Sequence, residues 1–160
     1  MIDVHFSYNL LIPTIRMWRK ERHLKNSTIH ICSIFFYTKL REDGPDAVKK
    51  WNAKIDIFAK KFIFISINES LHWSLCVVVN PGAILNNLKE LNEAPADEEL
   101  YPCILFFDSL KVHQKQVVAR NIRNWLNWEW NHRFKKLESP LEVNPFTENS
   151  FPVHAPSGKQ

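Results

Sequence analysis

The chain has 160 residues, of which 45% are hydrophobic, 12% aromatic and 24% charged, so it carries enough apolar material for a folded domain and is not a disordered chain. Its 21 Lys and Arg exceed its 17 Asp and Glu by a modest four, which favours an acidic protein partner over nucleic acid. No apolar run is long enough to cross a bilayer, and the first residues lack the pattern of a secretory signal, so we expect no membrane partner.

The first half of the chain predicts a basic segment, an ambiguous apolar segment and two strands. Residues 1–30 are basic and favour helix, and the dense apolar run 29–40 fits either a strand or a helix. Residues 61–67 and 72–79 are rich in β-branched and aromatic side chains, which predicts two strands joined by the short link 68–71.

The second half predicts a loop, a third strand and the clearest helix. Residues 80–102 are polar and contain several prolines, which indicates a loop insertion, and 103–107 form another apolar strand. Apolar residues recur at helical spacing over 114–134. The proline-rich tail 139–160 is expected to be extended or loop. The order of elements predicts an α+β fold, and residues 1–160 contain no linker that would divide them into two domains.

Polar side chains interrupt two of the apolar strands. His72 opens one strand, and Asp108 directly follows another. A histidine with a carboxylate partner is the base and orienting group of nucleophilic catalysis, because the carboxylate fixes the imidazole tautomer and stabilises imidazolium. The structural alternative is a histidine at a strand edge and an aspartate that caps the following turn.

No cysteine stands out as a nucleophile, and no cofactor site is recognisable. The cysteines at 32, 76 and 103 lie in apolar surroundings, which indicates reduced core residues. Cys76 would lie roughly 13 Å along the strand from His72, too far for proton transfer. The sequence has no paired cysteine or histidine metal motif and no glycine-rich phosphate loop, so we expect neither a metal nor a cofactor. The Trp-rich segment 125–130, with arginines nearby, offers a stacking platform for nucleic acid, but helical spacing assigns part of it to the core.

An ordered set of motifs resembles the SUMO-specific (Ulp/SENP) cysteine peptidases. The segment His72-Trp73-Ser74-Leu75 before an apolar strand resembles the H-W-x-L motif of that family, and the apolar strand that ends in Asp108-Ser109-Leu110 resembles its second motif. Phe35-Phe36-Tyr37 with Leu40 resembles F-F-Y-x-x-L, and Trp51 with Asp56-Ile57-Phe58 resembles W-x-x-x-x-D-I-F. The similarity covers about residues 29–136 in the family's order.

The resemblance implies a papain-like cysteine peptidase fold without a cofactor. It makes His72 the general base and Asp108 its orienting partner, and it places Trp73 in a narrow channel for the Gly-Gly tail of SUMO. Gln160 stands where the family has the glutamine of its oxyanion hole, ahead of the catalytic cysteine. We therefore expect a partial catalytic domain that is inactive as given, because the nucleophile would follow Gln160. The insertion at 80–102 resembles the branch that prefers poly-SUMO chains.

The expected function is that of a hydrolase, a thiol protease in the ubiquitin-like protein conjugation pathway that performs desumoylation by proteolysis. Its partners would be SUMO and SUMO-conjugated proteins, and we expect a monomer in the nucleus, with the cytoplasm as a second location. Two alternatives use the same residues. One is an inactive pseudo-protease that only binds SUMO, and the other is a protease for another modifier such as NEDD8.

Overall fold

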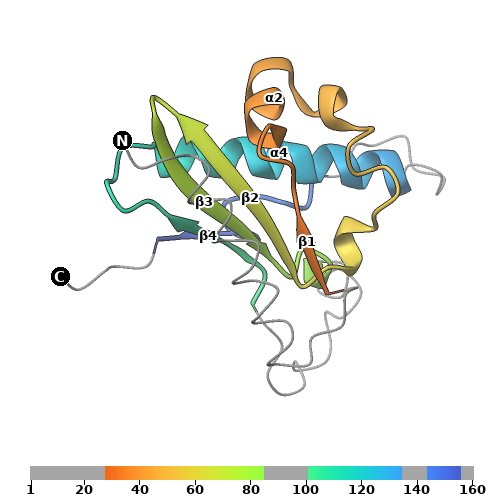
Figure 1. Cartoon of the computed structure of the whole chain (residues 1–160). Helices are drawn as coiled ribbons and strands as arrows, with labels where there is room; N and C mark the ends of the chain where they lie inside the picture. Colours follow the sequence, from red (N-terminus) through yellow and green to blue (C-terminus); the bar gives the residue numbers. More distant parts are fainter. Residues whose placement is uncertain (1–27, 85–100, 135–143, 156–160) are drawn as a thin grey trace.

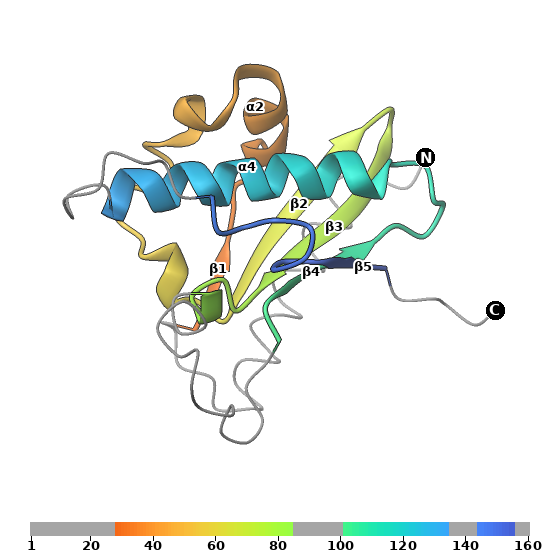
Figure 2. The same ribbon diagram turned by 180° about the vertical axis from the view of Figure 1, so that it is seen from behind.

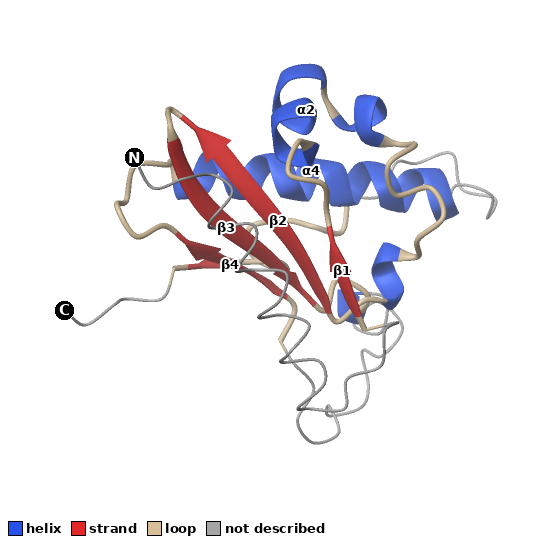
Figure 3. Ribbon diagram, in the orientation of Figure 1, coloured by secondary structure: helices blue, strands red, loops and turns tan. Residues whose placement is uncertain are grey.

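The computed structural model describes residues 28–84, 101–134 and 144–155. Within them lie five strands, β1 Ile29–Ile31, β2 Phe62–Glu69, β3 His72–Val79, β4 Cys103–Phe107 and β5 Val153–His154. These strands form one sheet in the order β1-β2-β3-β4-β5 (Figure 1). The inner pairs β2–β3 and β3–β4 are antiparallel, whereas the outer strands β1 and β5 pair in parallel with their neighbours. Helices and strands occupy separate layers (Figure 3), as expected for an α+β fold.

The centre of the sheet is the hairpin of β2 and β3, which the sequence predicts. β3 has its predicted bounds, whereas β2 continues two residues beyond its predicted end. The link is therefore only Ser70 and Leu71, whose φ angles are 53° and 60°. Two residues with positive φ form the tight turn that matches the twist of antiparallel strands. The predicted link 68–71 is too long, because the last two residues of β2 still pair with the first two of β3.

The ambiguous apolar run divides into two elements. Its first part is β1, which pairs with the start of β2, and its second part opens the helix α2, Phe36–Asp43. Phe36, Tyr37 and Leu40 are buried on one side of α2, which is the spacing of a helix face. The strand and helix interpretations are thus each correct for one part of the run. Two short 3-10 helices, η1 Pro45–Val48 and η2 Ile57–Ala59, follow α2 before β2 begins.

The helix α4, Lys115–Phe134, crosses one face of the sheet and confirms the predicted helix at 114–134 (Figure 2). Its apolar side chains enter the main core, where Trp125 is fully buried and meets the ring of Phe36 edge-on at 4.9 Å. Trp130 is buried as well, and the buried Arg123 donates from Nε to the carbonyl of Phe151 at 2.8 Å. These side chains face the protein interior, so they do not provide the stacking surface considered for nucleic acid.

The described part of the tail, 144–155, contains a strand that the sequence analysis did not predict. Phe146 and Phe151 are buried in the main core, and the side chain of Asn127 on α4 both donates to and accepts from the backbone of Phe146. These contacts hold the segment beside β4, where β5 completes the sheet. A strand of two residues has no periodicity to detect, so sequence patterns could not reveal it.

Two predicted features lie largely outside the described residues. Of the basic segment 1–30 only the last residues are described, and of the insertion 80–102 only its two ends are. At the first end, a Cβ on Gly82 would lie 2.1 Å from the carbonyl oxygen of Phe58, so the backbone leaving β3 packs directly against η2. Within the described ranges, no helix has the length and apolar character that a membrane span requires.

Candidate active site

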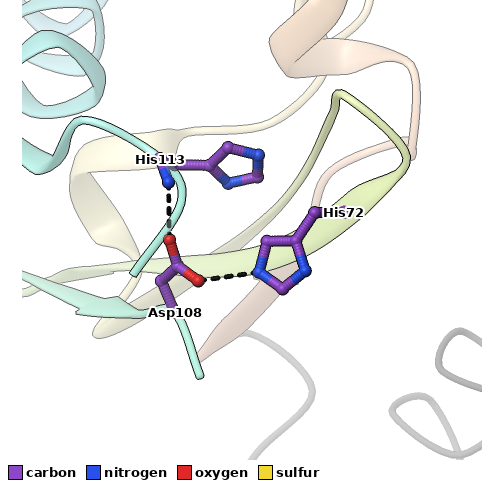
Figure 4. Close-up of side chains that lie close together, drawn as sticks. All are labelled: His72, Asp108 and His113. Atoms are coloured by element: carbon purple, nitrogen blue, oxygen red, sulfur yellow. Dashed lines mark hydrogen bonds and ion pairs between the residues drawn. The ribbon is translucent and has the colours of Figure 1, made fainter. Parts of the chain in front are cut away.

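The candidate site lies where β3 begins and β4 ends. Because these strands are antiparallel neighbours, with Leu75 opposite Phe107, the first residue of β3 and the residue after β4 meet at one edge of the sheet. There His72 Nε2 lies 2.7 Å from Asp108 Oδ1 (Figure 4). The His72 side chain is 14% exposed and that of Asp108 only 4%. The fold thus brings together two residues that are 36 positions apart in the sequence.

Asp108 is held by three hydrogen bonds. Its Oδ1 accepts from His72 and from the backbone N–H of Leu110 at 3.2 Å, and its Oδ2 accepts from the backbone N–H of His113 at 2.8 Å. Burial acts to raise the pKa of Asp108, but the bonds from His113, His72 and Leu110 outweigh it and hold that pKa below its ordinary value. The carboxylate is therefore ionised at neutral pH and accepts the Nε2 proton of His72.

This arrangement determines which nitrogen of His72 can act as a base. With Nε2–H donating to the carboxylate, the neutral ring carries its lone pair on Nδ1. Among the described residues, Nδ1 of His72 has no hydrogen-bond partner. A thiol or water placed beside Nδ1 could lose its proton to it, and Asp108 would stabilise the imidazolium that results.

A second histidine, His113, lies beside the pair and was missed by the sequence analysis. Its ring is 5.1 Å from that of His72 (Figure 4). His113 Nε2 donates to the carbonyl of Glu69 at 3.1 Å, so Nδ1 accepts from the Ser74 hydroxyl at 2.8 Å. Its position in the loop that carries Asp108 was the one available signal, but a histidine in a loop has no distinctive pattern.

The same three side chains are close enough to be considered as metal ligands. Ligand atoms of His72, Asp108 and His113 lie within 4.8 Å of one another. However, both ring nitrogens of His113 are engaged by Ser74 and Glu69, and Asp108 accepts three hydrogen bonds. His113 therefore has no nitrogen left for a metal, and the three side chains do not offer three ligands to a cation.

None of the three cysteines can serve the candidate site. Cys32 and Cys76 are 2% and 0% exposed, and Cys103 is buried at 8%. Burial raises the pKa of each thiol, which disfavours the reactive thiolate. Cys76 also pairs with Phe106 in the middle of the sheet, far along β3 from His72. The interpretation of the cysteines as core residues is confirmed.

Comparison with known proteins identifies the family. Residues 4–147 match the Ulp1 protease family, C-terminal catalytic domain. The chain belongs to the Ulp1 protease family. It is 31% identical over 180 residues to the probable ubiquitin-like-specific protease 2B of Arabidopsis thaliana, covering 94% of this chain and 18% of that protein. It is 35% identical over 143 residues to sentrin-specific protease 2 of Homo sapiens, covering 88% of this chain and 22% of that protein.

A solved structure, described as that of the de-sumoylating protease, superposes on this Ulp1-family chain with a TM-score of 0.66 and 26% sequence identity. The match covers 89% of this chain and 48% of the other. The expected α+β, papain-like fold of the family is confirmed. The chain spans about a fifth of the length of the curated relatives above and about half of the solved one.

The remaining predicted residues of this Ulp1-family chain are less informative. Trp73 is partly buried and follows His72 on β3, so its side chain projects to the opposite face of the sheet, the face of the buried Val77 and Val79. Its predicted role in a substrate channel stays a prediction. Gln160 lies outside the described residues, and its predicted role in an oxyanion hole also stays a prediction.

Proposed function

We propose that this chain supplies the histidine and aspartate of a cysteine peptidase that cleaves after the Gly-Gly tail of SUMO. The observation that carries the proposal is the His72–Asp108 pair, with its 2.7 Å hydrogen bond and a free lone pair on His72 Nδ1. Membership of the Ulp1 family and the likeness to a de-sumoylating protease support SUMO as the modifier. A nuclear location and a monomeric state remain predictions that rest on family resemblance.

In the proposed mechanism His72 acts first as a base and then as an acid. Its Nδ1 takes the proton of a cysteine thiol, and the thiolate attacks the carbonyl carbon of the last glycine in the Gly-Gly tail. Asp108 stabilises the imidazolium formed. His72 then returns the proton to the departing lysine amine, leaving a thioester, which water hydrolyses with His72 again as the base. Gln160 and backbone N–H groups would hold the oxyanion.

The nucleophile is proposed to come from residues other than these 160. The three cysteines of the chain are buried, and burial keeps their thiols protonated. A cavity of about 240 Å³ adjoins the pair and is lined by Phe106, Asp108, Lys111, His113, Lys115 and Ala155. Because β5 runs parallel to β4, the chain leaves β5 at the edge of the sheet that carries Asp108. Ala155, which directly follows β5, accordingly lines the same cavity as Asp108.

The test compares the 160-residue chain with the full-length gene product. Each is incubated with SUMO that carries a fluorescent amide after its Gly-Gly tail, and with the matching NEDD8 and ubiquitin substrates. We expect the full-length protein to cleave the SUMO substrate and the 160-residue chain to bind SUMO without turnover. In the full-length protein, His72→Gln should lower kcat at least about a thousandfold while SUMO binding is retained.

A matched control and the contrary outcomes make the test decisive. His132→Gln alters an exposed histidine on α4 that, among the described residues, hydrogen-bonds the carbonyl of Trp128 and stacks on its ring, so cleavage should stay unchanged. Turnover by the 160-residue chain would refute an external nucleophile. Binding of SUMO without cleavage by the full-length protein would identify the pseudo-protease, and faster cleavage of the NEDD8 substrate would reassign the modifier.

A further inference from the structure

The ring of His113 joins two segments that carry the candidate catalytic residues. One segment is the loop between β4 and α4, which contains Asp108 and His113 itself. The other is the β2–β3 hairpin, which contains Glu69, Ser74 and His72. The Nε2–H of His113 donates to the Glu69 carbonyl at 3.1 Å, and its Nδ1 accepts from Ser74 at 2.8 Å. His113 is 9% exposed; its bond to Ser74 is buried, and its bond to Glu69 is partly buried.

The backbone of the same residue touches Asp108. The N–H of His113 donates to Asp108 Oδ2 at 2.8 Å, while Asp108 Oδ1 faces His72. We propose that His113 is a positioning residue, which holds Asp108 against His72 by fastening the β4–α4 loop to the β2–β3 hairpin. Neither ring nitrogen of His113 is free to exchange a proton with substrate, so it acts through Asp108 and is not a catalytic residue.

Two features indicate that the fastening point on the hairpin is itself fixed. Glu69 lies opposite His72 in the register of β2 and β3, so the carbonyl that His113 binds is directly beside the base. The Glu69 carboxylate also pairs with Arg41 on α2, which anchors the end of the hairpin to a helix. Ser74 lies two residues after His72 and on the same face of β3. The two groups that His113 binds, the Glu69 carbonyl and the Ser74 hydroxyl, therefore both lie next to His72 in the hairpin.

The loop would otherwise be poorly restrained. Leu110 and Val112 are 68% and 51% exposed, and Lys111 adopts a positive φ of 53°. Exposed side chains contribute little packing, so hydrogen bonds must fix the path of the loop. His113 is the buried residue of this segment, and its ring adds two side-chain bonds to the hairpin beside the one that Asp108 makes with His72. Removal of the ring should let Asp108 move away from His72.

The first variant is His113→Leu, which keeps an apolar side chain of similar size but loses both ring bonds. We expect hydrogen exchange at the amide of residue 113 to become about tenfold faster or more, because its bond to Asp108 weakens. The pKa of the Asp108 carboxyl, followed by carbon NMR, should rise, because the bonds that lower it are weakened. His113→Gln should rescue both signals in part, since its amide can still donate to Glu69.

The control is His132→Leu, which removes a ring bond to a backbone carbonyl elsewhere and should alter neither signal. A His113→Leu protein with a lower melting temperature but an unchanged Asp108 pKa and amide exchange would overturn the proposal, because His113 would then only pack. If His113→Leu fails to fold, Ser74→Ala provides the test, because it removes the bond from the Ser74 hydroxyl to the His113 ring. A higher Asp108 pKa in Ser74→Ala would support the proposal, and an unchanged Asp108 pKa would refute it.

The catalytic consequence rests on the proposed function and is measured separately. In a cleaving full-length protein, His113→Leu should lower kcat with little change in KM, because His113 acts through Asp108 on the base His72. The NMR and exchange signals need no cleavage. If the wild-type protein does not cleave SUMO, the proposed function fails and the positioning role can still be judged. If it cleaves SUMO and the signals do not respond, the positioning role alone fails.

Discussion

Replacement of Asp108 by asparagine measures how much the His72–Asp108 pair contributes to stability. An asparagine can keep one oxygen toward the N–H of His113, but its NH2 group then faces His72 Nε2 and the N–H of Leu110. The variant loses a buried, charge-assisted bond to His72, and a bond of this kind contributes about 1.5–3 kcal/mol net. The Leu110 bond is exposed and adds little. We therefore expect the free energy of unfolding of Asp108→Asn at pH 7 to be about 2 kcal/mol lower than that of the wild type.

The pH dependence has a definite sign. The pKa of Asp108 in the folded protein lies below its ordinary value of 3.8, so its ionised form is stabilised by folding. That contribution is complete above the unfolded pKa and disappears as the pH falls through the folded pKa. The difference in unfolding free energy between wild type and Asp108→Asn should therefore be present at pH 5 and shrink below about pH 4, as the carboxyl of Asp108 becomes protonated in the folded protein.

Urea unfolding followed by tryptophan fluorescence at several pH values provides the assay. Asp46→Asn is the control, because that aspartate forms an exposed pair with Lys49, and its loss should change stability little at any pH. Equal stability of Asp108→Asn and wild type at pH 7 would refute the energetic argument. A difference that does not shrink as the pH falls below about pH 4 would refute the sign of the Asp108 pKa shift.

Three further predictions concern the core and the cysteines. Trp125→Ala should destabilise the protein by about 3–5 kcal/mol because its side chain is fully buried, whereas Trp128→Ala, partly exposed on the same helix, should cost far less in a thermal melt. Gly82→Ala should cost about 1–3 kcal/mol in urea unfolding, because its Cβ would collide with the carbonyl of Phe58. The three cysteines should resist iodoacetamide at pH 8 until urea unfolds the chain, since burial raises the pKa of each thiol. Labelling is measured by mass spectrometry, and rapid labelling of the native protein would contradict the assignment of the cysteines to the core.

Sequence patterns predicted the elements that have strong, continuous signals. β3 and β4 were found because each is a continuous apolar run, and α4 was found because its apolar residues recur at helical spacing. The apolar run 29–40 was ambiguous because it contains the end of one element and the start of another. β5 was missed because its place depends on tertiary contacts of Phe146 and Phe151 with the core, which no local pattern encodes.

The candidate site was partly predictable, because two of its residues lie at the ends of strands that the sequence predicts. His72 and Asp108 were conspicuous because each is a polar residue at the end of an apolar strand, and the antiparallel pairing of β3 and β4 brings them together. His113 was not predictable, because its importance comes from contacts with a serine hydroxyl and a backbone carbonyl in another segment. Contacts of this kind depend on how a loop folds over its neighbours, and no spacing rule describes that.

The short outer strands have a consequence for association between molecules. A long, flat strand at a sheet edge is a template on which another chain can add a strand and start an aggregate. Here β1 and β5 have three and two residues, so each offers a foreign strand few consecutive backbone groups. β1 pairs only with the first three residues of β2, and the far end of β2 is attached to α2 through the Arg41–Glu69 ion pair. In the described part of the chain, both outer strands are therefore too short to guide the addition of a further strand.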